Sequence, residues 1–94
     1  MLTVTRPGPD SEAGQANLPQ TAERMAEVYE RTAAVLEQSA SLAETHARRQ
    51  QRFGRDSAAE DERRTAAWAH DAAQRARNVA QHARDTAERT RRAR

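Results

Sequence analysis

The sequence predicts an all-α protein, an antiparallel two-helix hairpin that resembles a coiled coil and that we expect to pair into a four-helix bundle. Three observations lead to this prediction. Two long segments lack proline and glycine, and both repeat their apolar positions at helical spacing. The single glycine between them, Gly54, is flanked by signals that end one helix and begin the next. We expect a disordered N-terminal tail over residues 1–18 and the hairpin over residues 19–94.

The predicted tail holds most of the residues that interrupt regular structure. Two of the three prolines and two of the three glycines lie within it, and its apolar residues follow neither a helical nor a strand period. This composition is typical of a disordered segment. We therefore expect the first helix to span about 21–53, with Asn17 or Thr21 as its N-cap.

The first predicted helix carries a stripe of large apolar residues. Steps of three, four and seven separate them, which is the spacing of one helical face. The stripe consists of Met25, Val28, Tyr29, Val35, Leu36 and Leu42. Acidic residues lead this segment and arginines close it, an order that complements the helix dipole.

The turn and the second helix follow from local signals. Gly54 comes directly after Phe53, where a glycine can end a helix in the left-handed conformation. Ser57 and Glu60 match a capping box. We expect a turn at about 54–57 and a helix at about 58–92, although one uninterrupted helix is an alternative because a single glycine costs only about 1 kcal/mol. The stripe of the second helix is alanine, widened by Trp68 and Val79. The alanines are Ala66, Ala69, Ala73, Ala76, Ala80, Ala83 and Ala87.

The two segments are complementary in size and charge. In an antiparallel hairpin the large residues of the first helix would lie against the alanines of the second. The acidic start of each helix would lie beside the basic end of the other. Six acid–arginine pairs also have the favourable i,i+4 order within a helix. They are Glu27–Arg31, Glu44–Arg48, Glu60–Arg64, Asp71–Arg75, Asp85–Arg89 and Glu88–Arg92.

Two helices that touch along one stripe bury little apolar surface. We therefore expect the hairpin to form a homodimer with four helices in cross-section, or to bind a helical protein partner. The candidate interface residues are Met25, Val28, Tyr29, Val35, Leu36, Leu42, Trp68, Ala69, Ala73, Ala76, Val79, Ala80 and Ala83.

Catalytic and metal-binding patterns are missing from the sequence. It has no cysteine, its three histidines lack the spacing of metal ligands on one helix face, and its serines lack a nucleophile motif. We therefore expect neither an enzyme nor a cofactor, metal ion or small-molecule substrate. The predicted function is a non-enzymatic protein–protein interaction or oligomerisation module.

Arginine supplies every one of the 16 basic side chains, yet 14 acidic residues leave a net charge of only +2. The use of arginine without lysine suggests a GC-rich bacterial genome. The alternative function is nucleic-acid binding by the arginine-rich C-terminal end, through Arg89, Arg91, Arg92 and Arg94.

Targeting signals are also missing. The sequence has no apolar run long enough for a membrane span and no apolar stretch typical of a signal peptide. The mainly alanine face of the second helix is too small to anchor in lipid. We therefore expect a cytoplasmic protein without a membrane partner.

Overall fold

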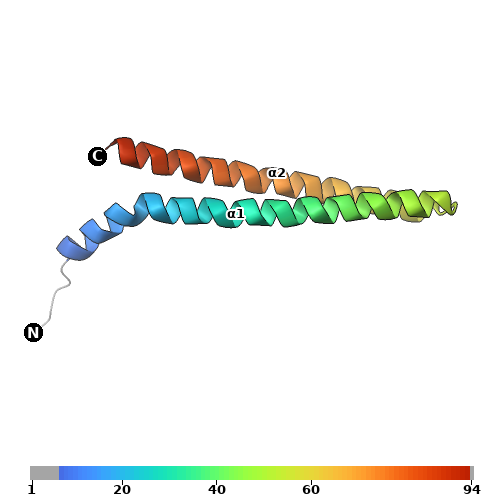
Figure 1. Cartoon of the computed structure of the whole chain (residues 1–94), viewed down its shortest axis with the longest axis horizontal. Coiled ribbons are helices and arrows are strands. Elements are labelled where there is room, and N and C mark those ends of the chain that lie inside the picture. Colours follow the sequence, from blue (N-terminus) through green and yellow to red (C-terminus); the bar gives the residue numbers. More distant parts are fainter. Residues whose placement is uncertain (1–6, 94) are drawn as a thin grey trace, which may run out of the picture.

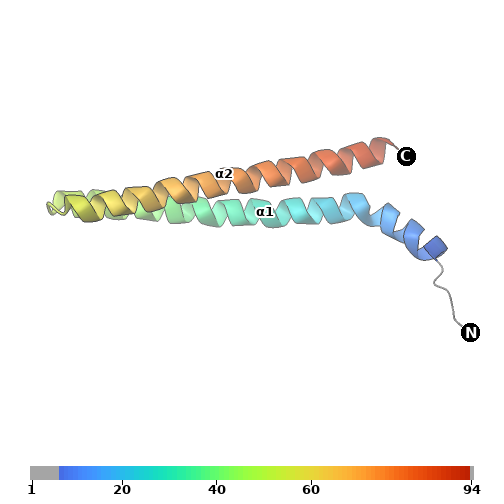
Figure 2. The same cartoon turned by 180° about the vertical axis from the view of Figure 1, so that it is seen from behind.

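Two long helices form an antiparallel hairpin. The computed structural model describes the backbone of residues 7–93 and the side chains of residues 17–93. Helix α1 (Pro7–Arg52) packs against helix α2 (Asp56–Arg92), and the turn lies at the end opposite the two termini (Figure 1). Figure 2 shows the same pair from behind. The predicted all-helical hairpin is confirmed over the described residues.

The first helix begins earlier than expected. Its first residue is Pro7, so the structure differs from the predicted tail over residues 7–18, while residues 1–6 of that tail lie outside the described part. Proline suits the first turn of a helix, where its missing N–H would have no intrahelical partner. Pro19 lies inside α1, where it removes a backbone hydrogen bond. In this region the N-terminal turns, blue in Figure 1, bend away from α2.

Backbone hydrogen bonds close the turn. Gly54 has a φ of 74°, in the left-handed region, as the sequence predicts. The Arg55 N–H donates to the Gln50 carbonyl at 2.8 Å, and the Gly54 N–H donates to the Gln51 carbonyl at 3.0 Å. This pair of bonds is the Schellman motif, which satisfies carbonyls at the end of α1.

The predicted capping box is wrong. Arg55 is the N-cap of α2 and makes no capping hydrogen bond through its side chain, and Ser57 already lies in the first helical turn. The Schellman motif leads the chain into α2 two residues earlier than the sequence signals indicate. Asp56 then places an acidic side chain in the first turn of α2, where it complements the helix dipole.

The seam between the helices is built from alanine on both sides. Apart from Pro19, every buried residue in the described part is an alanine. On α1 they are Ala26, Ala33, Ala40, Ala43 and Ala47. On α2 they are Ala59, Ala66, Ala69, Ala73, Ala76, Ala80, Ala83 and Ala87. The prediction that large residues of the first helix interdigitate with these alanines is therefore wrong for most of the stripe, although Leu36 does pack against Ala73 and Ala76.

Small side chains on both helices explain this arrangement. Four alanines of α1 recur at every seventh residue, from Ala26 to Ala47, and they match the heptad spacing of the alanines of α2. Alanine lets two helix backbones approach closely, because only methyl groups lie between them. A stripe of leucine, valine and methionine would hold the backbones further apart, so it lies outside the seam.

Candidate interaction surface

Nine large apolar side chains of the described residues are exposed, and seven of these, all except Tyr29 and Phe53, lie on one flank of the seam. We define these seven as the apolar face: Leu18, Met25, Val28, Val35, Leu42, Trp68 and Val79. Their exposed fractions run from 40% at Val79 to 62% at Trp68. Single exposed hydrophobic residues are common on proteins, whereas a large contiguous apolar patch is typical of an interaction site.

Helical spacing places these residues on one side of the hairpin. Thr21 stands seven residues before Val28, and His82 stands fourteen residues after Trp68, so each pair shares one helical row. Thr21 and His82 line the same pocket, which also includes Met25. The rows of α1 and α2 that carry the apolar face therefore border one another.

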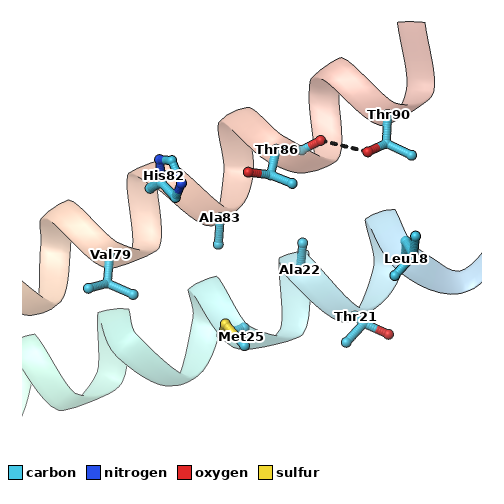
Figure 3. A pocket seen from close by; sticks show the side chains of 9 residues that line it. All are labelled: Leu18, Thr21, Ala22, Met25, Val79, His82, Ala83, Thr86 and Thr90. Atoms are coloured by element: carbon cyan, nitrogen blue, oxygen red, sulfur yellow. Dashed lines mark hydrogen bonds between the residues drawn. The ribbon is translucent and has the colours of Figure 1, made fainter. Parts of the chain in front are cut away.

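The pocket is a hollow of about 310 Å³ at the open end of the hairpin, between α1 and α2 (Figure 3). Its lining is mainly apolar and comes from both helices: Leu18, Thr21, Ala22, Met25, Val79, His82, Ala83, Thr86 and Thr90. The Thr90 hydroxyl donates to the Thr86 carbonyl at 2.9 Å, so its proton already has an acceptor within its own helix.

A charged ladder runs along the hairpin on the other flank of the seam. Every seventh residue of α1 contributes an acid, and every seventh residue of α2 contributes a base. The acids are Glu23, Glu30, Glu37 and Glu44, and the bases are Arg63, His70, Arg77, Arg84 and Arg91. Arg84 bonds Glu30 at 2.9 Å, Arg77 lies 3.2 Å from Glu37, and Arg91 pairs with Glu23.

His70 joins two acids of the ladder. Its Nδ1 lies 2.8 Å from Glu37 Oε1, and its Nε2 lies 2.7 Å from Glu44 Oε1. Hydrogen bonds to Glu44 and Glu37 raise the pKa of His70 above its ordinary value. Hydrogen bonds from His70 and Arg77 lower the pKa of the Glu37 carboxyl. Over residues 17–93, no group of three or more acidic or histidine side chains is arranged to hold a metal ion.

The predicted charge complementarity is confirmed at the open end, where the acidic start of α1 meets the basic end of α2. At the turn, the arginines that end α1 form no ion pair with the acids of α2 in the described part. His46 lies 3.8 Å from Glu62 there instead. Of the six predicted i,i+4 pairs, two occur as ion pairs. They are Glu27–Arg31 at 3.7 Å and Glu88–Arg92 at 3.2 Å.

The predicted interface residues fall into two main groups, with Leu36 and Tyr29 in neither. The five alanines from Ala69 to Ala83 are buried in the seam inside the hairpin. Leu36 is partly buried against the cluster of Ala33, Ala73 and Ala76. Tyr29 stands seven residues before Leu36 in the same row and is 37% exposed. The remaining six belong to the apolar face: Met25, Val28, Val35, Leu42, Trp68 and Val79.

Three of the four predicted C-terminal arginines already contact other side chains of the chain. Arg91 pairs with Glu23, and Arg92 lies 3.2 Å from Glu88. Arg89 donates to the Thr86 hydroxyl at 3.4 Å, and Arg94 lies outside the described residues. Neither α1 nor α2 contains, in its described part, an apolar stretch of the length needed to cross a bilayer.

Comparison with known proteins identifies no relative. No protein-family model matches the chain, and no curated protein or solved structure is significantly similar to it. The function must therefore be argued from the side chains themselves.

Two features of the site were missed from the sequence, the alanine row of α1 and the middle of the charged ladder, where His70 bonds Glu37 and Glu44. Both have a visible signal, because alanine recurs from Ala26 to Ala47 and glutamate recurs from Glu23 to Glu44 at steps of seven. Seven-residue recurrence of small residues and of one sign of charge is the signal that would have found them.

Proposed function

We propose that this protein is a non-enzymatic helical interaction module that self-associates, with two hairpins stacking their apolar faces into a four-helix bundle. The observation that carries the proposal is the apolar face: seven large hydrophobic side chains are exposed beside a seam whose buried hydrophobic residues are all alanines. No large side chain is fully buried in the described hairpin.

The energetics favour covering this face. Burying a whole Val, Leu or Met side chain contributes about 1.5–3 kcal/mol. Covering the roughly half-exposed side chains of two apolar faces would thus contribute on the order of 10–20 kcal/mol. Association costs an estimated 4–15 kcal/mol in lost translational and rotational freedom. A second copy presents the same apolar surface, and a symmetric dimer covers both faces at once.

Nucleic-acid binding is the alternative proposal. Arg89 favours it, since it makes no ion pair in the described part of the chain. Against it, Arg91 and Arg92 have acidic partners. Loss of salt-dependent DNA or RNA binding on deletion of residues 88–94 would support this alternative.

Val35→Glu tests the self-association. Val35 is 60% exposed on the apolar face, so the substitution leaves the seam intact but would bury a charge in the dimer. The matched control is Ala34→Glu, at an exposed neighbouring position that belongs to neither the seam nor the apolar face. In sedimentation equilibrium we expect twice the chain mass of 10.5 kDa for the wild type and the control, and the chain mass itself for Val35→Glu.

Three results would contradict the proposal. A wild-type chain that is a fully helical, cooperatively melting monomer at micromolar concentration would refute self-association. Equal dissociation of Val35→Glu and Ala34→Glu would refute the role of the apolar face. A poorly helical wild-type monomer would overturn the homodimer and favour a different helical partner instead.

A further inference from the structure

The apolar face contains both a hollow and a protruding aromatic side chain. The hollow is the pocket of about 310 Å³ at the open end. The aromatic is Trp68, which is 62% exposed in the same helical row as His82 of the pocket. Fourteen residues separate Trp68 from His82, about 21 Å along α2 at 1.5 Å per residue. Trp68 therefore cannot fill the pocket of its own chain.

We infer that the second copy stacks with its turn at the opposite end, so that Trp68 of each copy occupies the pocket of the other. This inference rests on the proposed self-association and specifies its geometry. A bulky aromatic side chain in a pocket is the usual form of an interface hot spot.

The outer row of α2 is self-complementary in this orientation. It consists of Asp61, Trp68, Arg75, His82 and Arg89, each seven residues after the last. When the row runs antiparallel to its own copy about a two-fold axis at Arg75, Trp68 meets the partner's His82. Asp61 then meets the partner's Arg89, which makes no ion pair in the described chain.

A second row reinforces the same register. Arg64 lies 2.5 Å from Asp61, and in this register it meets the partner's Asp85. Asp61 of one copy thus lies beside Arg89 of the other, and Arg64 beside Asp85, so both of these cross-chain pairs join opposite charges. Arg75 approaches its own copy at the axis, where the Asp71 carboxylate, four residues earlier on the same helix, supplies a negative charge.

The large residues of α1 also meet in this register. Ala33 and Leu36 of α1 pack with Ala73 and Ala76 of α2, so the level of Arg75 on α2 corresponds to about Val35 on α1. Val35 therefore meets its own copy near the axis. By the same count, Val28 meets the partner's Leu42.

The opposite stacking, with both turns at one end, fits less well. It places the pocket of one copy over the pocket of the other, and it places Trp68 over the partner's Leu42. When the two pockets face each other, the side chains that line them lack van der Waals partners. Placing Trp68 in the pocket removes that loss at both ends of the dimer.

Spin labels distinguish the two stackings. The chain has no cysteine, so Ser57→Cys provides one label site per chain near the turn. Each label would lie 18 residues from the axis, which predicts a separation of about 54 Å in the dimer. With both turns at one end, the separation would be about 20 Å or less, since packed helices lie about 8–10 Å apart. A short distance overturns the inference and leaves self-association intact, whereas a monomer overturns both.

A double-mutant cycle tests the contact itself. Trp68→Ala should raise the dimer dissociation constant at least about tenfold. When Trp68→Ala is combined with Val79→Ala in the pocket, the increase in the dimer dissociation constant should be at least about threefold smaller than the product of the two single increases. The reason is that the two side chains touch across the dimer. The matched control combines Trp68→Ala with Leu42→Ala, whose effects should multiply. Coupling to Leu42 rather than to Val79 would overturn the inference.

Discussion

Enlarging one seam alanine tests how closely the helices approach. Ala73 is fully buried and clusters with Ala33 and Ala76. Ala73→Leu adds three carbon atoms at a point where only methyl groups separate the backbones. Overpacking of this kind costs about 1–3 kcal/mol. For a domain of this size, each kcal/mol lowers the melting temperature by about 4–8 °C.

The matched control is Ala67→Leu, six residues before Ala73 and exposed on α2. Leucine and alanine differ little in helix propensity, and exposed substitutions usually change stability by less than about 0.5 kcal/mol. Thermal unfolding followed by circular dichroism, at one fixed protomer concentration, should therefore show a large loss for Ala73→Leu and almost none for Ala67→Leu. A higher melting temperature for Ala73→Leu would refute the close approach of the helices.

Two further changes have predictable outcomes. At low salt, the ladder should stabilise the hairpin most between about pH 4.5 and 6.5. The pKa of His70 is raised, so its stabilising effect is lost as the pH rises through that pKa. The pKa of Glu37 is lowered, so its stabilising effect is lost as the pH falls through that pKa. Melting curves that extend from this range to pH values above the raised pKa of His70 should show a smaller alkaline loss in His70→Gln, and an unchanged loss would contradict the role of the bridge to Glu44. Gly54→Ala should destabilise the chain by about 1–2 kcal/mol in denaturant titration, because a φ of 74° disfavours a Cβ while no atom within 4 Å obstructs it. Gly54→Asn should lose less, and equal stability of all three chains would show that the left-handed turn is not needed.

The turn and the hairpin could be predicted because their signals are local. Gly54 needs only its own backbone conformation and the carbonyls of the preceding turn to end α1. The start of α1 could not be placed so well, because proline near a helix start, as at Pro7, is compatible with both a helix and a tail.

The choice of seam was harder for a physical reason. Two neighbouring stripes of α1 repeat at the same spacing, one of large residues such as Val35 and one of alanines such as Ala33. Periodicity shows that each stripe lies on one face, but it does not show which face the second helix covers. Hydrophobicity favours the large stripe, whereas matching alanines on α2 favour the small one. The middle of the ladder was missed because Glu44 was paired with Arg48 on its own helix, whereas in the structure it bonds His70 on the other helix.

The seam and the ladder share a seven-residue repeat, so the short turn must determine how the two helices align. Both repeat every seven residues, so sliding α2 along α1 by about 10.5 Å would again bring alanine against alanine and acid against base. Such a repeat defines which faces meet but leaves several alignments close in energy. Because only three residues connect Arg52 to Asp56, the covalent link permits one alignment. The turn thus fixes the register of the two helices, and the same two helices as separate peptides would pair in several shifted alignments.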